Sequence, residues 1–319
     1  MARVIVTGGV GFIGTHLTRA LLARGDEVVV IDDFSNAPYS SERKRQNRDD
    51  LKSAHPSPRI VSACVSDRDA IAPLFEGVDL VFHLAALAGV RPSFEYPARY
   101  ARVNVEGTAV VFELAREAGC ESFVFASSSS VYGNSTPLPA REDAPAIAPE
   151  SPYAATKRGM ELVVSTLCRR APAMRCAALR YFTVYGPRQR PEMAITLFVQ
   201  AMLAGQPITV FGDGSMRRDF THVSDIVRGT LAAADHAPAG LRSYNLGSGA
   251  PVDLRTLIAT IGAATGAAPV VNHAPQPLGD VDATFADITR AREELDWTPR
   301  VALREGIETV VGWVRDGIG

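Results

Sequence analysis

The start of the chain limits the possible folds more than any other stretch. Residues 3–7 are mostly apolar and β-branched, which predicts a short buried strand, and a glycine-rich loop over residues 8–14 follows directly. Gly8 permits a tight turn, Gly11 lets the backbone approach a pyrophosphate, and Gly14 allows a helix to pack closely on the strand. The loop therefore predicts a phosphate site at the N-terminus of a helix, where unpaired N–H groups face the ligand.

Two acidic residues follow the second predicted strand, which covers residues 27–31. Asp32 stands at the end of this strand, with Asp33 beside it. A carboxylate in this place accepts hydrogen bonds from ribose hydroxyls and repels a 2′-phosphate, so the pattern predicts NAD rather than NADP as the cofactor. The basic residues 43–45 could bind a phosphate, but they lie too far along the chain to be its default partners.

Short apolar runs then alternate with helical patterns. Further strands are predicted at residues 59–65, 80–84, 123–127 and 176–182, and helices at residues 12–24, 41–52, 97–118 and 152–170. This alternation predicts an α/β fold with a Rossmann-like, doubly wound parallel sheet. We expect residues 1–186 to form an NAD-binding domain, and we expect the chain to return to this domain near residues 223–250. Residues 187–319 are richer in proline and glycine and predict a smaller C-terminal substrate-binding lobe.

Composition narrows the range of partners. The formal net charge of −2 gives no reason to expect nucleic acid or an anionic membrane surface as a partner. No apolar run approaches the length of a membrane span. The four cysteines are scattered without the spacing of metal ligands, so we expect a reduced, cytoplasmic protein with no metal site.

A second group of residues carries acid–base chemistry. Tyr153 and Lys157 are four residues apart, which places both side chains on one face of a helix. A phenol with an ordinary pKa of ~10 is a poor base at neutral pH, but the Lys157 ammonium and the charge of an oxidised nicotinamide would stabilise the phenolate. Residues 127–130 are four serines at the end of a predicted strand, where ligands bind in open parallel sheets. Ser128 can therefore hydrogen-bond a reacting hydroxyl.

These motifs together resemble the extended short-chain dehydrogenase/reductase family, in its NAD-dependent nucleotide-sugar epimerase/dehydratase branch. The resemblance covers nearly the whole chain. The matching stretches are Gly8–Gly14, His83–Ala86, Ser127–Gly133, Tyr153–Lys157, Arg180–Pro187, Phe211–Gly214 and Arg218–Phe220.

The resemblance implies a role for each matching residue. Tyr153 is the catalytic base, Lys157 lowers its pKa, and Ser128 binds the sugar hydroxyl. The implied cofactor-binding residues are Gly8, Gly11, Phe12, Ile13, Gly14, Asp32, Asp33, Val65, Ala85, Ala86, Asn104, Ser127, Tyr153, Lys157 and Val184. The implied substrate-binding residues are Arg91, Ser128, Ser129, Ser130, Tyr153, Thr183, Arg190, Phe211 and Arg218. His83 is given a packing role only. Relatives commonly pair through two long helices, so a homodimer through residues 97–118 and 152–170 is expected.

One position departs from the family pattern. Cys64 stands where relatives usually carry an aspartate that bonds the adenine amino group. A thiol is a weak acceptor, so we expect no side-chain contact to adenine from Cys64. The backbone near Val65 can still contact the adenine.

The branch shares an oxidation at C4 of the sugar, and other residues decide the later steps. Dehydratases of the branch place an aspartate–glutamate pair directly after the catalytic hydroxyl residue in order to eliminate water. Ser129 and Ser130 occupy that place in this chain, and neither can act as a general acid. The sequence therefore predicts a 4-epimerase, which needs only room for the 4-keto sugar to rotate.

The identity of the sugar is predicted from the stretch around Thr183. Residues 188–194 are similar to a motif of UDP-glucuronate 4-epimerases, as are residues 88–91. Ser129, Ser130 and Thr183 could donate hydrogen bonds to a uronate carboxylate, and Arg190 could pair with it. The expected reaction converts UDP-glucuronate to UDP-galacturonate. The alternatives are a UDP-glucose 4-epimerase, a UDP-glucuronate decarboxylase and, in a different class, a non-catalytic NAD-sensing protein.

Overall fold

Both faces of the first strand are apolar, and this determines how the rest of the chain packs around it. In β1 (Arg3–Thr7), Val4 and Val6 are fully buried against α1 (Phe12–Ala23), whereas Ile5 is buried on the opposite face. Successive side chains of a strand point to opposite faces, so an apolar strand of this kind needs a helical layer on each side. The computed structural model describes residues 1–35, 41–54, 56–275 and 283–317.

The central sheet has seven strands, and every neighbouring pair is parallel. From one edge to the other the strands are β3 (Arg59–Ser62), β2 (Glu27–Asp32), β1, β4 (Leu80–His83), β5 (Ser122–Ser128), β6 (Arg175–Tyr181) and β11 (Gly240–Leu246). The chain order reverses between β1 and β4, which is where ligands bind in sheets of this topology. The predicted Rossmann-like α/β class is confirmed.

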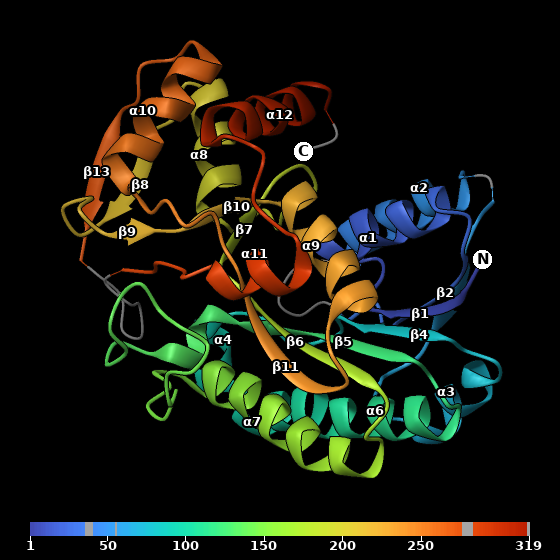
Figure 1. Ribbon diagram of the computed structural model, residues 1–319. Helices are drawn as coiled ribbons and strands as arrows, with labels where there is room; N and C mark the ends of the chain where they lie inside the picture. The colour runs from blue at the N-terminus through green and yellow to red at the C-terminus, as the bar shows by residue number, and fades with distance from the viewer. Residues whose placement is uncertain (36–40, 55, 276–282, 318–319) are drawn as a thin grey trace.

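Helices cover both faces of this sheet (Figure 1). One layer consists of α1, α2 (Ser41–Lys52), α9 (Val223–His236) and α11 (Thr289–Leu295). The elements of the other layer and of its connections are α3 (Arg68–Ile71), η1 (Ala72–Phe75), α4 (Val90–Glu95), α5 (Pro97–Tyr100), η2 (Ala101–Glu106), α6 (Gly107–Glu117), η3 (Ser129–Tyr132), α7 (Pro152–Leu167) and η4 (Cys168–Arg170). None of the helices in the described ranges is long and apolar enough to cross a membrane.

A smaller lobe stands over the carboxyl ends of the strands (Figure 1). Its elements are β7 (Thr183–Tyr185), α8 (Ala194–Leu203), β8 (Ile208–Phe211), β9 (Arg217–Arg218), β10 (Phe220–His222), β12 (Val252–Asp253), α10 (Leu254–Thr265), β13 (Val271–Ala274) and α12 (Leu303–Arg315). These strands form two-stranded sheets, so the lobe depends on its own apolar core for stability. Phe198 of α8, Ile261 of α10 and Val310 of α12 are buried in this core.

Several predicted elements differ in detail from the observed ones; for example, the helix predicted over 152–170 is divided into α7 and the 3₁₀ segment η4. The strand predicted over 59–65 ends at Ser62, because the Asp67 N–H turns back to donate to the Cys64 carbonyl at 3.0 Å. The helix predicted over 97–118 is divided into α5, the π-helical segment η2 and α6. A π-helical turn inside a helix frequently marks a functional site.

Candidate active site

A cavity of about 1120 Å³ opens at the carboxyl ends of the central strands. Its walls include Gly8 after β1, Asp32 at the end of β2 and Ser128 at the end of β5, and the smaller lobe closes it with α8 and Phe211. This is the crevice in which doubly wound sheets bind their ligands. The volume is sufficient for a ligand larger than a typical drug-sized molecule.

The glycine loop forms one end of this cavity. Gly8 has a φ of 70°, and a Cβ atom there would lie 2.8 Å from the Ala85 backbone nitrogen. A Cβ atom at Gly14 would lie 2.1 Å from the Gly8 carbonyl oxygen, so α1 packs against the loop only because residue 14 has no side chain. Gly11 is the N-cap of α1, which directs the free N–H groups of the first turn at the cavity.

Asp32 is buried at the end of β2, and its carboxylate has a partner that the sequence pattern did not indicate. Its Oδ1 atom accepts from the Phe34 N–H and from Lys44 Nζ, both at 3.0 Å. Burial raises the pKa of the Asp32 carboxyl, and the Lys44 ammonium acts in the opposite direction. Lys44 is not expected from the sequence to be the default partner of a phosphate, but α2 folds back and brings it into the cavity wall beside Asp32.

The loop after β4 forms the next part of the wall and is held from behind by Asn104. The Asn104 side chain accepts from the Leu87 N–H at 2.7 Å and donates to Thr156 Oγ1 of α7 at 2.9 Å. Asn104 is fully buried in η2 and does not line the cavity, so it connects the loop that carries Ala85 and Ala86 to the helix that carries Tyr153.

His83 and Cys64 lie at the margins of this region. His83 is fully buried between the hydroxyls of Thr7 and Thr108, at 2.7 and 3.0 Å, and burial lowers its pKa to about 3. The buried ring between two hydroxyls lies outside the cavity lining, which agrees with the packing role expected from the sequence. Cys64 lines the cavity next to Val65, with its thiol 3.2 Å from the Ser66 hydroxyl.

The three predicted catalytic side chains are brought together on α7 and β5. Ser151 begins α7 by accepting from the Ala154 N–H at 3.2 Å, and the fixed φ of Pro152 favours the first turn. One turn further along, Lys157 donates to the Ala126 carbonyl at 2.7 Å, with its Nζ atom 5.9 Å from the centre of the Tyr153 ring. Burial lowers the pKa of Lys157 to about 7.

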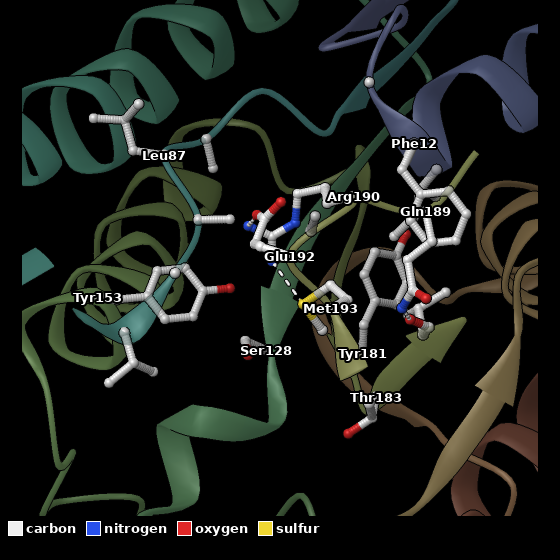
Figure 2. Close-up of a pocket in the computed structure, with 18 of the residues that line it drawn as sticks. Phe12, Leu87, Ser128, Tyr153, Tyr181, Thr183, Gln189, Arg190, Glu192 and Met193 are labelled. Carbon is white, nitrogen blue, oxygen red and sulfur yellow. Dashed lines mark hydrogen bonds and ion pairs between the residues drawn. The ribbon is translucent and has the colours of Figure 1, made fainter. Parts of the chain in front are cut away.

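Tyr153 presents its hydroxyl to the middle of the cavity, with Ser128 on one side and Arg190 on the other (Figure 2). Burial raises the pKa of Tyr153, whereas the Ser128 hydroxyl and the positive charge of Arg190 lower it. The ring is supported edge-on by Tyr100, with 6.4 Å between the ring centres. A phenol oriented in this way can exchange a proton with a hydroxyl bound in the cavity.

A buried ion pair lies beneath the serine strand. Both carboxylate oxygens of Glu161 accept from Arg180, at 2.9 and 2.8 Å, and neither side chain is more than 2% exposed. Ser127 donates to the same carboxylate at 2.6 Å, and Arg158 also donates to it at 2.8 Å. The Ser127 hydroxyl is therefore turned into this network, and its neighbour Ser128 takes the place facing the cavity.

The wall opposite Tyr153 is a loop that carries Arg190. The Arg190 guanidinium is paired with Glu192 Oε1 at 3.0 Å and lies 3.4 Å from Met193 Sδ (Figure 2). The side chains of Arg190 and Glu192 are 19% and 44% exposed, so the pair is accessible to a ligand that enters the cavity.

Arg188, two residues earlier, points away from this cavity. Its guanidinium donates to Asn47 Oδ1 at 2.7 Å and pairs with Asp50 at 2.6 Å, both on α2. Between the two arginines, Gln189 is buried and donates to the Val184 carbonyl at 2.8 Å. These contacts hold the base of the loop, and Arg190 is the residue that the loop presents to the cavity.

The far end of the cavity combines an aromatic ring and basic side chains. The Arg91 guanidinium lies 5.2 Å from the centre of the Phe211 ring, which joins α4 to the end of β8. Arg218 of β9 lines the same region. An aromatic ring beside cationic groups suits a ligand in which a nucleobase is joined to a diphosphate.

Most of the residues predicted for the site line this one cavity. They are Gly8, Gly11, Phe12, Ile13, Gly14, Asp32, Asp33, Val65, Ala85, Ala86, Arg91, Ser127, Ser128, Ser129, Ser130, Tyr153, Lys157, Thr183, Val184, Arg190, Phe211 and Arg218. Leu87, Gln189 and Glu192 also line the cavity and are not among the predicted site residues, and neither is Lys44, which the sequence indicates only as a possible partner of a phosphate. Glu192 had a usable signal, because it is an acid two residues from a predicted substrate-binding arginine. Within the described part of the chain, no group of histidine, cysteine and acidic side chains is arranged to hold a metal ion.

Comparison with known sequences identifies relatives of the whole chain. The family described as "NAD dependent epimerase/dehydratase family" matches residues 4–247. UDP-glucuronate 4-epimerase of Thermodesulfobacterium geofontis is 36% identical, over 100% of this chain and 98% of the relative. UDP-glucose 4-epimerase of Mycolicibacterium smegmatis is 38% identical, over 98% of this chain and 99% of the relative.

The comparison with solved structures gives the same picture. UDP-glucuronic acid 4-epimerase from Bacillus cereus, in complex with UDP-glucuronic acid and NAD, superposes with a TM-score of 0.90. That protein is 32% identical, and the match covers 98% of this chain and 99% of the other. The similarity in sequence and in the arrangement of helices and strands therefore extends over nearly the whole chain.

Proposed function

This chain belongs to the NAD dependent epimerase/dehydratase family, and from that premise we propose that it is an NAD-dependent UDP-sugar 4-epimerase acting on UDP-glucuronate. The observation that carries the proposal is the position of the Tyr153 hydroxyl. It lies in one cavity between the serines that follow β5 and Arg190, which is a cation suited to a sugar carboxylate.

The residues at the glycine-loop end of the cavity fit NAD. The absence of side chains at Gly8 and Gly14 lets the loop pack tightly between β1 and α1, so that the N-terminus of α1 at Gly11 lines the cavity where a pyrophosphate would lie. The Asp32 carboxylate stands where ribose hydroxyls donate. Val65, Ala85 and Val184 supply the apolar walls. When bound, NAD supplies the acceptor, and later the donor, of a hydride at C4 of the sugar.

In this proposal the protein moves the proton that accompanies the hydride. Tyr153 receives the proton of the sugar 4-hydroxyl and later returns it, while Ser128 orients that hydroxyl by a hydrogen bond. The positive charge of Arg190 and the Ser128 hydroxyl favour the phenolate because both lower the pKa of Tyr153. Lys157 is buried behind the ring, with its Nζ atom 5.9 Å from the ring centre, and in its protonated form it would add a positive charge there.

The outcome at C4 depends on what surrounds the 4-keto sugar. The side chains at 129 and 130 are serines that line the cavity, and neither hydroxyl is acidic enough to expel water from the sugar. A 4-keto sugar in a cavity of about 1120 Å³ has room to rotate and present its other face. Epimerisation follows from rotation and reduction, without a further acid.

The uronate carboxylate needs restraint as well as recognition. A 4-keto uronate is a β-keto acid, which loses carbon dioxide readily when the carboxylate can rotate into line with the ketone. Arg190, together with the hydroxyls of Ser129, Ser130 and Thr183, can hold the carboxylate out of that alignment by charge-assisted hydrogen bonds. We propose this restraint as the feature that separates the enzyme from a decarboxylase.

A second candidate function is UDP-glucose 4-epimerase. The Mycolicibacterium smegmatis relative with that name is 38% identical, and Arg190 has a carboxylate partner within the chain, Glu192. A neutral sugar would leave that pair intact. The chemistry at Tyr153 would be the same for either substrate.

The test is a product assay on the purified protein. Incubation with UDP-glucuronate, and separately with UDP-glucose, is followed by NMR of the anomeric and H4 protons. We expect UDP-galacturonate to form at a higher kcat/KM than UDP-galactose. Faster conversion of UDP-glucose would replace the proposal with the second candidate, and release of carbon dioxide would replace it with a decarboxylase.

The parts of the chain divide the ligand between them in this proposal. Residues 1–186, with returns near 223–250, hold NAD, and residues 187–319 mainly hold the sugar nucleotide. We propose a homodimer through α7 and the α5–α6 segment, supported by Leu162, which is 52% exposed on α7. Light scattering checks the dimer, and Leu162→Arg is expected to shift it to monomer.

Every described cysteine is a free thiol, which supports a reducing compartment such as the cytoplasm.

A further inference from the structure

Lys44 is a buried cation in the cofactor end of the cavity, and the proposed reaction does not use it. It is 8% exposed, and its Nζ atom is 3.0 Å from one Asp32 oxygen and 3.7 Å from an Asp33 oxygen. An ammonium with so little access to water requires an anion beside it. In this chain the anion is the carboxylate at the end of β2.

The backbone position of Lys44 is set by α2, which is anchored by contacts that do not involve Asp32. Leu51, near the end of the helix, is fully buried in the core beside the sheet. Asn47 is also fully buried and donates to the Val10 carbonyl of the glycine loop at 3.0 Å. If Asp32 lost its charge, α2 would still place the Lys44 ammonium at the same edge of the cofactor site.

That edge is where a dinucleotide presents its 2′ position. Asp32 stands at the family position that contacts ribose hydroxyls, and a 2′-phosphate is rejected there because two anions would meet. In an NADP-binding site of this fold, a nearby cation, usually an arginine, accommodates the 2′-phosphate. Lys44 already provides a cation at this edge, and the Asp32 carboxylate is paired with it.

We propose that Lys44 is a binding site for the 2′-phosphate of a phosphorylated nicotinamide dinucleotide, and that the Asp32 carboxylate occupies this site in place of the phosphate. The inference rests on the proposed cofactor site but not on the identity of the sugar. Asp32 then has two tasks, which are to accept from the ribose and to fill the anion position beside Lys44. Loss of its charge opens the position nearest Lys44 to the 2′-phosphate, and leaves the partly exposed Asp33 carboxylate at 3.7 Å as a weaker competitor.

The test measures which dinucleotide the protein retains. Wild type, Asp32→Ser, Lys44→Met and the double variant are each equilibrated with equimolar NAD and NADP, freed of excess ligand and denatured. The released dinucleotides are then separated and counted. We expect Asp32→Ser to raise the ratio of NADP to NAD about ten- to a hundredfold, since a charge-assisted hydrogen bond has that effect on an equilibrium. Adding Lys44→Met should reverse most of this gain.

Lys52→Met is the matched control, because Lys52 is an exposed lysine at the end of the same helix. Combined with Asp32→Ser, it should leave the raised ratio unchanged. Equal retention of NADP by Asp32→Ser with and without Lys44→Met would overturn the proposal, and so would an unchanged ratio in Asp32→Ser. Asp32→Asn keeps the shape of the side chain and provides the same comparison if the serine variant retains no dinucleotide. Failure of the proposed function would instead appear as wild-type protein that retains no NAD.

Discussion

The two walls that face each other across the sugar end of the cavity are built from different kinds of structure. The wall that carries Tyr153 consists of α7 and β5, and beneath it lies the Glu161–Arg180 pair, which is at most 2% exposed. The wall that carries Arg190 is a loop between β7 and α8, and its ion pair with Glu192 is 19% and 44% exposed. We call these the Tyr153 wall and the Arg190 wall.

This difference separates chemistry from selectivity. A buried, fully hydrogen-bonded ion pair holds its elements in one arrangement, and a general base needs that fixed geometry. A partly exposed pair contributes little to stability and can exchange partners with a ligand. The Tyr153 wall should therefore act equally on every substrate of the proposed reaction, whereas the Arg190 wall should distinguish a uronate from a neutral sugar.

The largest effect is expected from Tyr153→Phe. Removing the hydroxyl removes the base, so kcat should fall about 10²- to 10⁴-fold while NAD stays bound. Initial rates on UDP-glucuronate and UDP-glucose, with the bound dinucleotide measured after denaturation, check both parts. Tyr96→Phe, at an exposed tyrosine, is the control and should be fully active. Normal turnover by the Tyr153 variant would contradict the mechanism.

A loss of stability is expected from Glu161→Gln. The Arg180 guanidinium would stay buried without a charged partner, which should lower the free energy of unfolding by about 3 kcal/mol. Urea denaturation measures this loss. Glu117→Gln removes an exposed partner of Arg68 and should change stability by less than about 0.5 kcal/mol. If both variants unfold at the same urea concentration, buried charge is not what holds the Tyr153 wall.

A change in selectivity is expected from Arg190→Ala. Loss of the charge-assisted contact should reduce kcat/KM for UDP-glucuronate about tenfold or more, with a smaller loss for UDP-glucose. The ratio of the two kcat/KM values is the measurement. Arg188→Ala removes a guanidinium that is paired with α2 outside the cavity, so it should affect both substrates alike. Equal losses in the Arg190 variant would refute a carboxylate contact.

Arg190→Ala is also expected to change the pH dependence of kcat. Arg190 lowers the pKa of Tyr153, so its removal should raise that pKa. The phenolate then forms only at higher pH, and the acidic limb of the kcat profile should move to higher pH. An unchanged limb would show that Arg190 does not influence the base electrostatically.

The smallest effect is expected from Glu192→Gln. Without Glu192 as a competing anion, Arg190 is free for the substrate, and KM for UDP-glucuronate should fall about two- to fivefold, as expected for a partly exposed ion pair. KM for UDP-glucose should change little. Glu308→Gln removes another exposed pair, with Arg304, and serves as the control. A parallel change on both substrates would argue against competition at Arg190.

Local patterns made much of this site predictable. The strand and glycine loop at the N-terminus, and the helix that carries Tyr153 and Lys157, depend on residues close together in the sequence. The Ser127 hydroxyl could not be placed in this way, because the decision between the cavity and Glu161 depends on a helix 34 residues away. The pair between Lys44 and Asp32 could not be predicted for the same reason, since sequence distance from Asp32 does not show where α2 folds back.

The sequence by itself determined the class of fold, and it predicted the dinucleotide loop and the catalytic residues, because periodicity, glycine spacing and an i,i+4 pair are local properties of the chain. Only the tertiary structure decided the partner of each charge. Lys44 joins Asp32, Arg188 joins α2, and Arg190 remains in the cavity beside Glu192. Electrostatic partners are chosen by distance and burial in three dimensions, and these depend on how separate elements pack.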